Sequence, residues 1–251
     1  MTIFERPSWI DFGDVDRRTL RFLWDDARVH QDFTGDASDV LDAAEDMSVR
    51  ARLALLAGLY EWVLWRFDGL HQREEATQIL EAAWCGTVDP RYLVFFELTR
   101  EEWVGPVEGP LWCAFTFLEK GFRQAHAFHK DTFQAIEFNY LLAMHVLPST
   151  EPFERWLDLT LNRFEETYPV PPEDPFEDLF EERIGAYLGE FVGRDALNPA
   201  IPVDVTRDRA FLTQILEQAH AVENPFLATE EDLEDLGFGD VPYVLPQVAE
   251  P

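Results

Sequence analysis

Residues 53–67 read LALLAGLYEWVLWRF, the most hydrophobic run in the chain. Apolar side chains recur in it at three- and four-residue spacing, which is the period of an α-helix. Ser48 stands just before the run, where its hydroxyl can cap the first turn of a helix that continues to Phe67. The run is interrupted by Glu61 and Arg66 and is shorter than the about 20 apolar residues that a membrane span needs. We therefore expect a buried helix at the centre of its domain.

The rest of the chain shows the same helical period. Strand signals are almost absent, and no Asn-Gly or Asp-Gly turn joins two alternating runs. The sequence predicts an all-α fold, a helical bundle or irregular helical array of about eight to ten helices with essentially no sheet. Besides the central helix, we expect helices near residues 72–85 (ended by Gly86), 90–96 (opened by Asp89), 110–126 (opened by Pro110), 131–147, 151–168, 174–192, 207–222 and 230–236 (capped by Thr229).

We expect a single domain over residues 1–251, in which any sub-division falls near 105–110 or 169–173. Acidic residues dominate its charge, with 49 Asp and Glu against 20 Lys and Arg, a formal charge of −29. Residues 151–191 carry −9 and residues 223–251, an acidic C-terminal tail without a base, carry −8. The 47% hydrophobic content, with 21 Phe and 8 Trp, excludes intrinsic disorder. The acid must therefore cover a well-filled interior.

Two clusters of carboxylates within these stretches are the candidate partner-binding residues. The first crowds the opening turns of the expected helix 174–192, where only Arg183 offsets it. The second lies in the tail. An anionic surface of this kind accelerates association with a basic protein. The predicted site consists of Glu173, Asp174, Glu177, Asp178, Glu181 and Glu182 in the first cluster and Glu230, Glu231, Asp232, Glu234 and Asp235 in the second.

Residues that would carry a reaction are sparse. His126 and His129 are three apart and are weak metal-ligand candidates, because no third ligand is fixed by spacing. Cys85 and Cys113 lack a metal-type or redox spacing and are expected to be reduced core thiols. Nucleotide-binding, P-loop, zinc-protease and hydrolase motifs are absent from the sequence. We therefore predict a protein that is not an enzyme and that uses no cofactor.

The leading hypothesis is a bacterial immunity protein, in which the acidic surface neutralises a basic partner such as a toxin or nuclease. Three alternatives stay open: a DNA mimic that inhibits a DNA-binding protein, a helical metal-dependent enzyme, and an ordinary helical protein with a halophilic surface. The negative charge argues against direct contact with nucleic acid or an anionic membrane. Residues 1–13 do not resemble a secretory signal, so a cytoplasmic location is expected.

Overall fold

The computed structural model describes residues 4–13, 18–29, 33–123, 125, 129–171, 188–221 and 223–246, with backbone alone at positions 129 and 220. Within these ranges the chain forms eight α-helices, three short 3-10 helices and no β-strand, which confirms the predicted all-α array. The elements in chain order are α2 (Ser38–Glu45), α3 (Val49–Arg66), α4 (Glu75–Val88), η1 (Pro90–Tyr92), η2 (Arg100–Glu102), α5 (Gly105–Arg123), α6 (His129–Val146), α7 (Glu151–Thr167), η3 (Arg194–Leu197), α9 (Val205–Ala221) and α10 (Glu230–Asp235).

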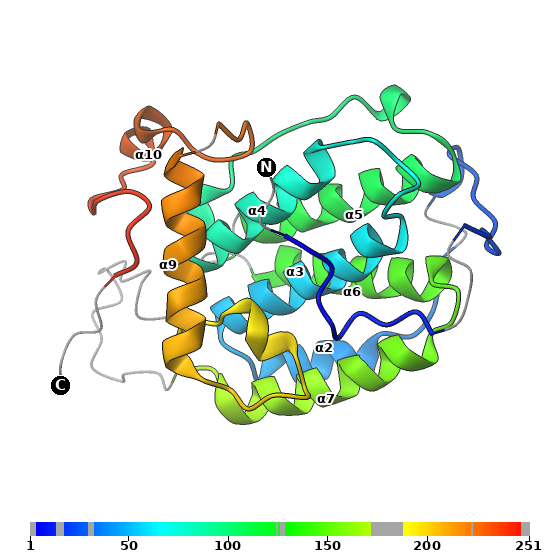
Figure 1. Cartoon of the computed structure of the whole chain (residues 1–251), viewed down its shortest axis with the longest axis horizontal. Coiled ribbons are helices and arrows are strands. Elements are labelled where there is room, and N and C mark those ends of the chain that lie inside the picture. Colours follow the sequence, from blue (N-terminus) through cyan, green and yellow to red (C-terminus); the bar gives the residue numbers. More distant parts are fainter. Residues whose placement is uncertain are drawn as a thin grey trace.

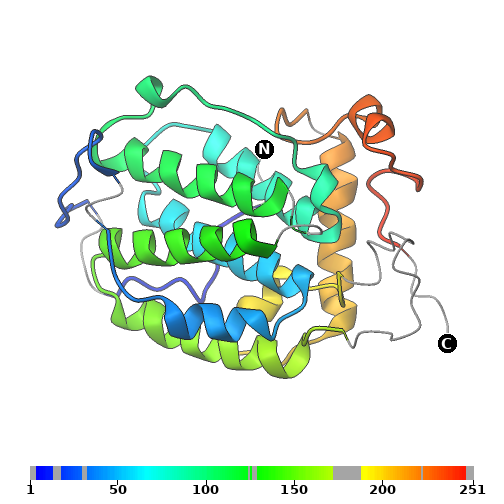
Figure 2. The same cartoon turned by 180° about the vertical axis from the view of Figure 1, so that it is seen from behind.

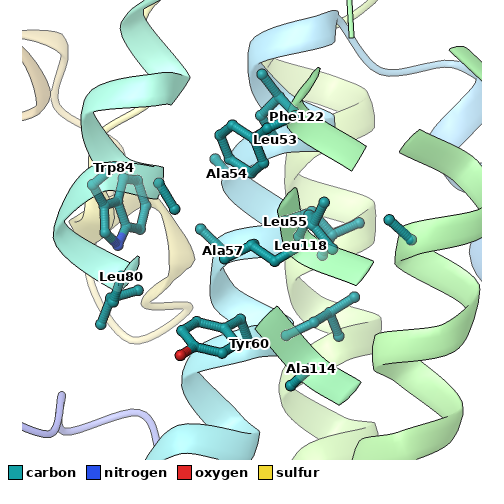
Figure 3. Close-up of a cluster of buried hydrophobic side chains, with 14 of the residues drawn as sticks. Leu53, Ala54, Leu55, Ala57, Tyr60, Leu80, Trp84, Ala114, Leu118 and Phe122 are labelled. Carbon is teal, nitrogen blue, oxygen red and sulfur yellow. The ribbon is translucent and has the colours of Figure 1, made fainter. Parts of the chain in front are cut away.

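The central helix is α3, and every one of its residues is buried. Helices α4, α5 and α6 pack around it, and α9 packs on the outer side of α4 (Figures 1 and 2). The Ser48 hydroxyl accepts a hydrogen bond from the Ala51 N–H at 3.3 Å, so the predicted cap is present. Leucine and alanine side chains of α3 meet Trp84 of α4 and Phe122 of α5 in a continuous core (Figure 3). Burial on all sides accounts for the apolar run that the sequence shows.

Three arginines of α3 are buried, and each holds the end of another helix. The last carbonyls of an α-helix have no donor within the helix, so outside donors must satisfy them. The arginine fork supplies such donors without exposing the helix end to water. The contacts are Arg50 Nη2 to the Val88 carbonyl of α4 at 2.9 Å, Arg52 Nε to the Ala44 carbonyl of α2 at 2.7 Å, and Arg66 Nε to the Val146 carbonyl of α6 at 3.0 Å.

Glu61, the one acidic residue of α3, is 0% exposed. Its two carboxylate oxygens accept hydrogen bonds from the indole N–H groups of Trp65 and Trp84, each at 3.1 Å. Arg194 of η3 forms an ion pair with the same carboxylate and places its Nε 2.8 Å from Oε1. A buried charge is costly unless it is paired and hydrogen-bonded, and here both conditions are met. The network fixes η3 onto the centre of the fold.

Helix α4 does not end where the sequence predicts. It continues through Gly86 to Val88, so the expectation of a glycine stop is wrong. A Cβ at Gly86 would lie 2.8 Å from Cδ1 of Phe122, closer than side chains tolerate. Glycine is therefore present because α5 approaches α4 closely at this point. The sequence alone predicts a cap here, because a glycine needed for packing and a glycine needed for a turn look alike in sequence.

Two further helix predictions are wrong at their starts or ends. Asp89 caps a single turn, η1, but residues 93–98 are extended where a helix to residue 96 was expected. The Val94 N–H instead donates to the Phe226 carbonyl at 3.1 Å, so a contact distant in sequence overrides the local signal. Helix α5 begins at Gly105, which has a φ of +84°, and contains Pro110, which was expected to open it.

Most of the expected helix 174–192 lies outside the described residues, and the part that is described, 188–192, is not helical. The predicted helices near 131–147, 151–168, 207–222 and 230–236 correspond to α6, α7, α9 and α10. Helix α2 and the short turns η2 and η3 were not predicted. None of the helices in the described part of the chain combines the length and hydropathy that crossing a bilayer requires.

Candidate functional site

The predicted partner-binding residues divide into two sets. The first set lies within residues 172–187, which are outside the described part of the chain, so its arrangement stays a prediction. It comprises Glu173, Asp174, Glu177, Asp178, Glu181 and Glu182. The second set lies on α10, and all five of its members are exposed. It comprises Glu230, Glu231, Asp232, Glu234 and Asp235.

Helix α10 starts with the capping arrangement that Thr229 predicts. The Asp232 N–H donates to the Thr229 hydroxyl at 3.1 Å, and the Thr229 N–H donates to the Asp232 carboxylate at 2.8 Å. The Thr229 hydroxyl donates to the same carboxylate at 2.7 Å, and its donation together with that of the Thr229 N–H favours the charged form and lowers the pKa of Asp232. Leu233 is the buried member of the helix and turns into the core. Asp232 therefore has a structural role, whereas the other four acids form no ion pair within the described residues.

The chain after α10 is fixed to the body of the protein by aromatic contacts. The Tyr243 ring stacks on Tyr92 with ring centres 4.5 Å apart, and Phe238 contacts the same ring at 5.5 Å. The Tyr243 N–H donates to the Tyr92 hydroxyl at 3.0 Å, and the Tyr243 hydroxyl donates to the Ala228 carbonyl. Tyr243 has a φ of 57°, which is unfavourable for an aromatic residue and persists only where its surroundings fix it. Residues 223–246, the C-terminal segment, thus have a defined conformation.

Large apolar side chains are exposed in the C-terminal segment beside its acids. Leu236 is 56% exposed at the end of α10, Val241 is 69% exposed and Val244 is 55% exposed. Single exposed apolar residues are ordinary, and these three fall within nine positions of the same acidic segment. The neighbouring Phe226, Leu227 and Leu233 are buried, so the segment has an anchored side and an exposed side.

The described acids of residues 151–191 lie elsewhere. Glu151, Glu154 and Asp158 are exposed on α7. Helix α7 and helix α10 stand near opposite ends of α9 in both views (Figures 1 and 2). The acids of α7 and α10 therefore do not form one patch, and α7 offers a natural comparison surface for experiments on α10.

The residues considered for catalysis or metal binding give no assembled site in the part of the chain that is described. His126 lies outside the described residues, as does the side chain of His129, so this metal hypothesis stays untested. Cys85 and Cys113 are buried free thiols, and burial raises the pKa of Cys113 to about 12. A protonated thiol is a poor nucleophile and a poor ligand. No cluster of three His, Cys, Asp or Glu side chains suited to a metal ion occurs among the described residues.

Sequence reasoning identified the acids of α10 but missed what holds them in place. Tyr92 lies far from the C-terminal segment in sequence, and no local pattern connects the two. Phe238 and Tyr243 were the available signal, since aromatic residues in an otherwise acidic segment point to an anchored structure. Comparison with known proteins adds no assignment to this geometry, because no protein-family model, curated protein or solved structure matches the chain.

Proposed function

We propose that this protein is a non-enzymatic binding protein whose C-terminal segment engages a basic protein partner. The observation that carries the proposal is one anchored segment that exposes both the carboxylates of α10 and the apolar side chains of Leu236, Val241 and Val244. Carboxylates steer a basic partner and determine its orientation. Apolar side chains provide surface that is removed from water when the partner binds. A fixed backbone lowers the ordering cost of association.

The partner class that fits this chemistry is a protein whose working surface is positively charged. A nuclease is the clearest example, because its substrate is a polyanion and its binding site must be basic. We therefore propose neutralisation of a toxin of this kind, the action of a bacterial immunity protein in the cytoplasm. A surface adapted only to high salt would need the acids but would have no use for the exposed leucine and valines, and this difference favours the binding function.

The test compares two variants with the same change in charge. In the first, Glu230, Glu231 and Glu234 become Gln; in the second, Glu151, Glu154 and Asp158 on α7 become Gln, Gln and Asn. Wild-type protein is used to capture a partner from the native cell, and the purified partner is then titrated by calorimetry at low and physiological salt. We expect the α10 variant to bind about tenfold more weakly at low salt and to lose salt dependence, because electrostatic steering falls with ionic strength.

A V241S/V244S variant tests the apolar contribution, with an expected loss of about 1 kcal/mol or more of binding free energy. Equal affinity of wild type and the α10 variant at low salt would contradict the proposal. Competition by duplex DNA for the captured partner would instead favour DNA mimicry, in which the acids replace phosphates.

A further inference from the structure

A groove of about 490 Å³ lies between the extended residues 95–99 and helix α5. Phe95, Phe96, Trp112 and Phe117 supply its apolar walls. Its volume is in the range of pockets that hold small organic molecules, typically about 300–1,000 Å³. One wall is the extended segment in which a helix was expected, so the groove depends on the tertiary contacts that hold this segment extended.

The lining of the groove reverses the charge balance of the protein. The chain has 49 acidic residues against 20 basic ones, but the lining contains three bases and two acids. They are Arg100, Lys120, Arg123, Glu97 and Glu119. Glu119 is 5% exposed, whereas the side chains of Lys120 and Arg123 are 36% and 47% exposed. The accessible charges that α5 presents to a molecule in the groove are therefore positive.

The guanidinium of Arg123 is only partly engaged. Its Nη2 donates to Glu119 Oε2 at 3.2 Å and its Nε lies 3.0 Å from Glu119 Oε1, so Glu119 occupies the edge formed by Nε and Nη2. The Nη1 group has no acceptor within the described part of the chain. The guanidinium also lies over the Phe95 ring, 4.6 Å from its centre, and so adjoins an apolar wall of the groove. The unused edge of such a planar fork can bind a second carboxylate.

Lys120 adds a second cation beside Arg123. The two residues are three positions apart on α5, so their side chains lie on the same face of the helix. The Lys120 ammonium lies 3.5 Å from the Asp131 carboxylate and donates to the Gln134 side chain. These contacts engage at most two of the three N–H donors of the ammonium. One donor of Lys120 is therefore left for a ligand.

The counter-charge that Glu119 supplies to Arg123 is incomplete at neutral pH. Burial, reinforced by the negative charge of Glu97, raises the pKa of Glu119 to about 7 against the opposing effect of Arg123. Near that pH about half of the molecules carry a protonated Glu119, and Arg123 then lacks an anionic partner. Glu97 opposes an anionic ligand, but it is exposed, so water and salt screen its charge.

We propose that this groove binds a small molecule that carries a carboxylate on an apolar body. The carboxylate accepts hydrogen bonds from Arg123 and Lys120 in the last turn of α5, and the apolar body packs against the rings of Phe96 and Phe117. Charge-assisted hydrogen bonds fix the polar end of the ligand, while burial of the apolar end provides affinity. The site is separate from the C-terminal acids, so this inference does not depend on the proposed partner binding.

The test titrates the full-length protein with 4-phenylbutanoate, monitored by NMR or calorimetry near neutral pH. The comparators are 4-phenylbutan-1-ol and 4-phenylbutylamine, which have the same apolar body. We expect the carboxylate to bind at least about tenfold more tightly than either comparator, because it alone complements both cations. Arg123→Gln should weaken its binding at least about tenfold.

Two further variants separate a charge effect from damage to the groove. Glu119→Gln should strengthen binding of 4-phenylbutanoate about threefold, because the neutral amide no longer competes for the charge of Arg123. A groove that was merely damaged by the substitution would bind more weakly, so weaker binding in this variant would contradict the proposal. The control is Glu234→Gln, which removes one negative charge on α10 and should leave binding unchanged.

Equal binding of 4-phenylbutanoate and 4-phenylbutylamine would overturn the proposal, as would wild-type affinity in the Arg123→Gln variant. A thermal melt establishes whether that variant is folded. If it is not, Lys120→Gln decides the matter, because the Lys120 side chain is 36% exposed and its replacement leaves the core intact. We expect about threefold weaker binding in Lys120→Gln, and unchanged affinity there would then overturn the proposal.

Discussion

Helix α3 and the C-terminal segment both combine charged and aromatic side chains, but the charges are buried in α3 and exposed on α10 of the C-terminal segment. The charged residues of α3 are all buried, and each is paired with a helix-end carbonyl, an indole N–H or an opposite charge. The acids of α10 are exposed, and only Asp232 is engaged, through the Thr229 cap. Charge inside the protein therefore holds helices together, whereas charge on α10 is left available to other molecules.

The comparison explains part of the surface acidity. With 20 basic residues against 49 acidic ones, each arginine that turns inward leaves a surface acid unpaired. Arg163 adds to the trend, since its guanidinium donates to the carbonyls of Ala196, Asn198 and Pro199 around η3. This role suits arginine better than lysine, because a planar fork can reach several carbonyls at once. The surface is acidic in part because several arginines lie in the interior, where they do not neutralise surface carboxylates.

The largest expected effect comes from removing the buried charge of α3. Glu61→Ala leaves Arg194 without its counter-ion and two indole N–H groups without an acceptor, and should cost about 3–5 kcal/mol of unfolding free energy. Glu61→Gln keeps an acceptor and should cost less. Urea unfolding followed by tryptophan fluorescence measures both. A loss below about 1 kcal/mol for the alanine variant would contradict the role assigned to inward charge.

A smaller effect is expected at the helix-end contacts. Arg50→Met removes the donors to the Val88 carbonyl and should lower the free energy of unfolding by about 2–3 kcal/mol. Arg207→Met is the matched control, because Arg207 is 43% exposed and its carboxylate partners lie 3.7 Å away. Its loss should be about 0.5 kcal/mol or less, as for other surface pairs. Equal losses in the two variants would remove the distinction between buried and exposed arginines.

Glu119 is intermediate between the two regions, because its carboxylate is buried but only one of its oxygens accepts a hydrogen bond. Its ordinary pKa of 4.5 is raised to about 7 in the folded protein by burial. A carboxyl group whose pKa is higher in the folded than in the unfolded state costs the folded protein stability when it ionises. The free energy of unfolding should therefore fall as pH rises from about 4.5 to about 7. Glu119→Gln should remove this part of the pH dependence and raise the free energy of unfolding by about 1–3 kcal/mol at pH 8. Denaturant titrations across pH, with Glu234→Gln as control, measure it.

The smallest effects are expected on α10. Asp232→Asn weakens the cap and should cost about 1 kcal/mol, whereas Glu231→Gln on the same helix should change stability by less than about 0.5 kcal/mol. Hydrogen exchange of amides 229–236 measures the local effect. A cost at Glu231 as large as that at Asp232 would mean that the exposed acids are structural after all, and would weaken the proposed partner-binding role.

Prediction from sequence succeeded where the signal is local. Ser48 and the apolar run located α3, and Thr229 located α10, because caps and helical period act within a few residues. The helix boundaries predicted at Gly86 and Pro110 are wrong, because each residue lies inside a helix that is stabilised by tertiary packing. Of the candidate site, the acids of α10 were predicted, but their anchoring on Tyr92 was not.

The sequence by itself determined the all-α class, the central helix and the excess of acid, since composition and periodicity are properties of neighbouring residues. Only the tertiary structure decided which charges are buried, where α7 and α10 lie relative to each other, and that residues 93–98 stay extended against the C-terminal segment. These outcomes depend on contacts between residues far apart in the chain. No local pattern encodes such contacts, because their energy is gained only when the helices pack.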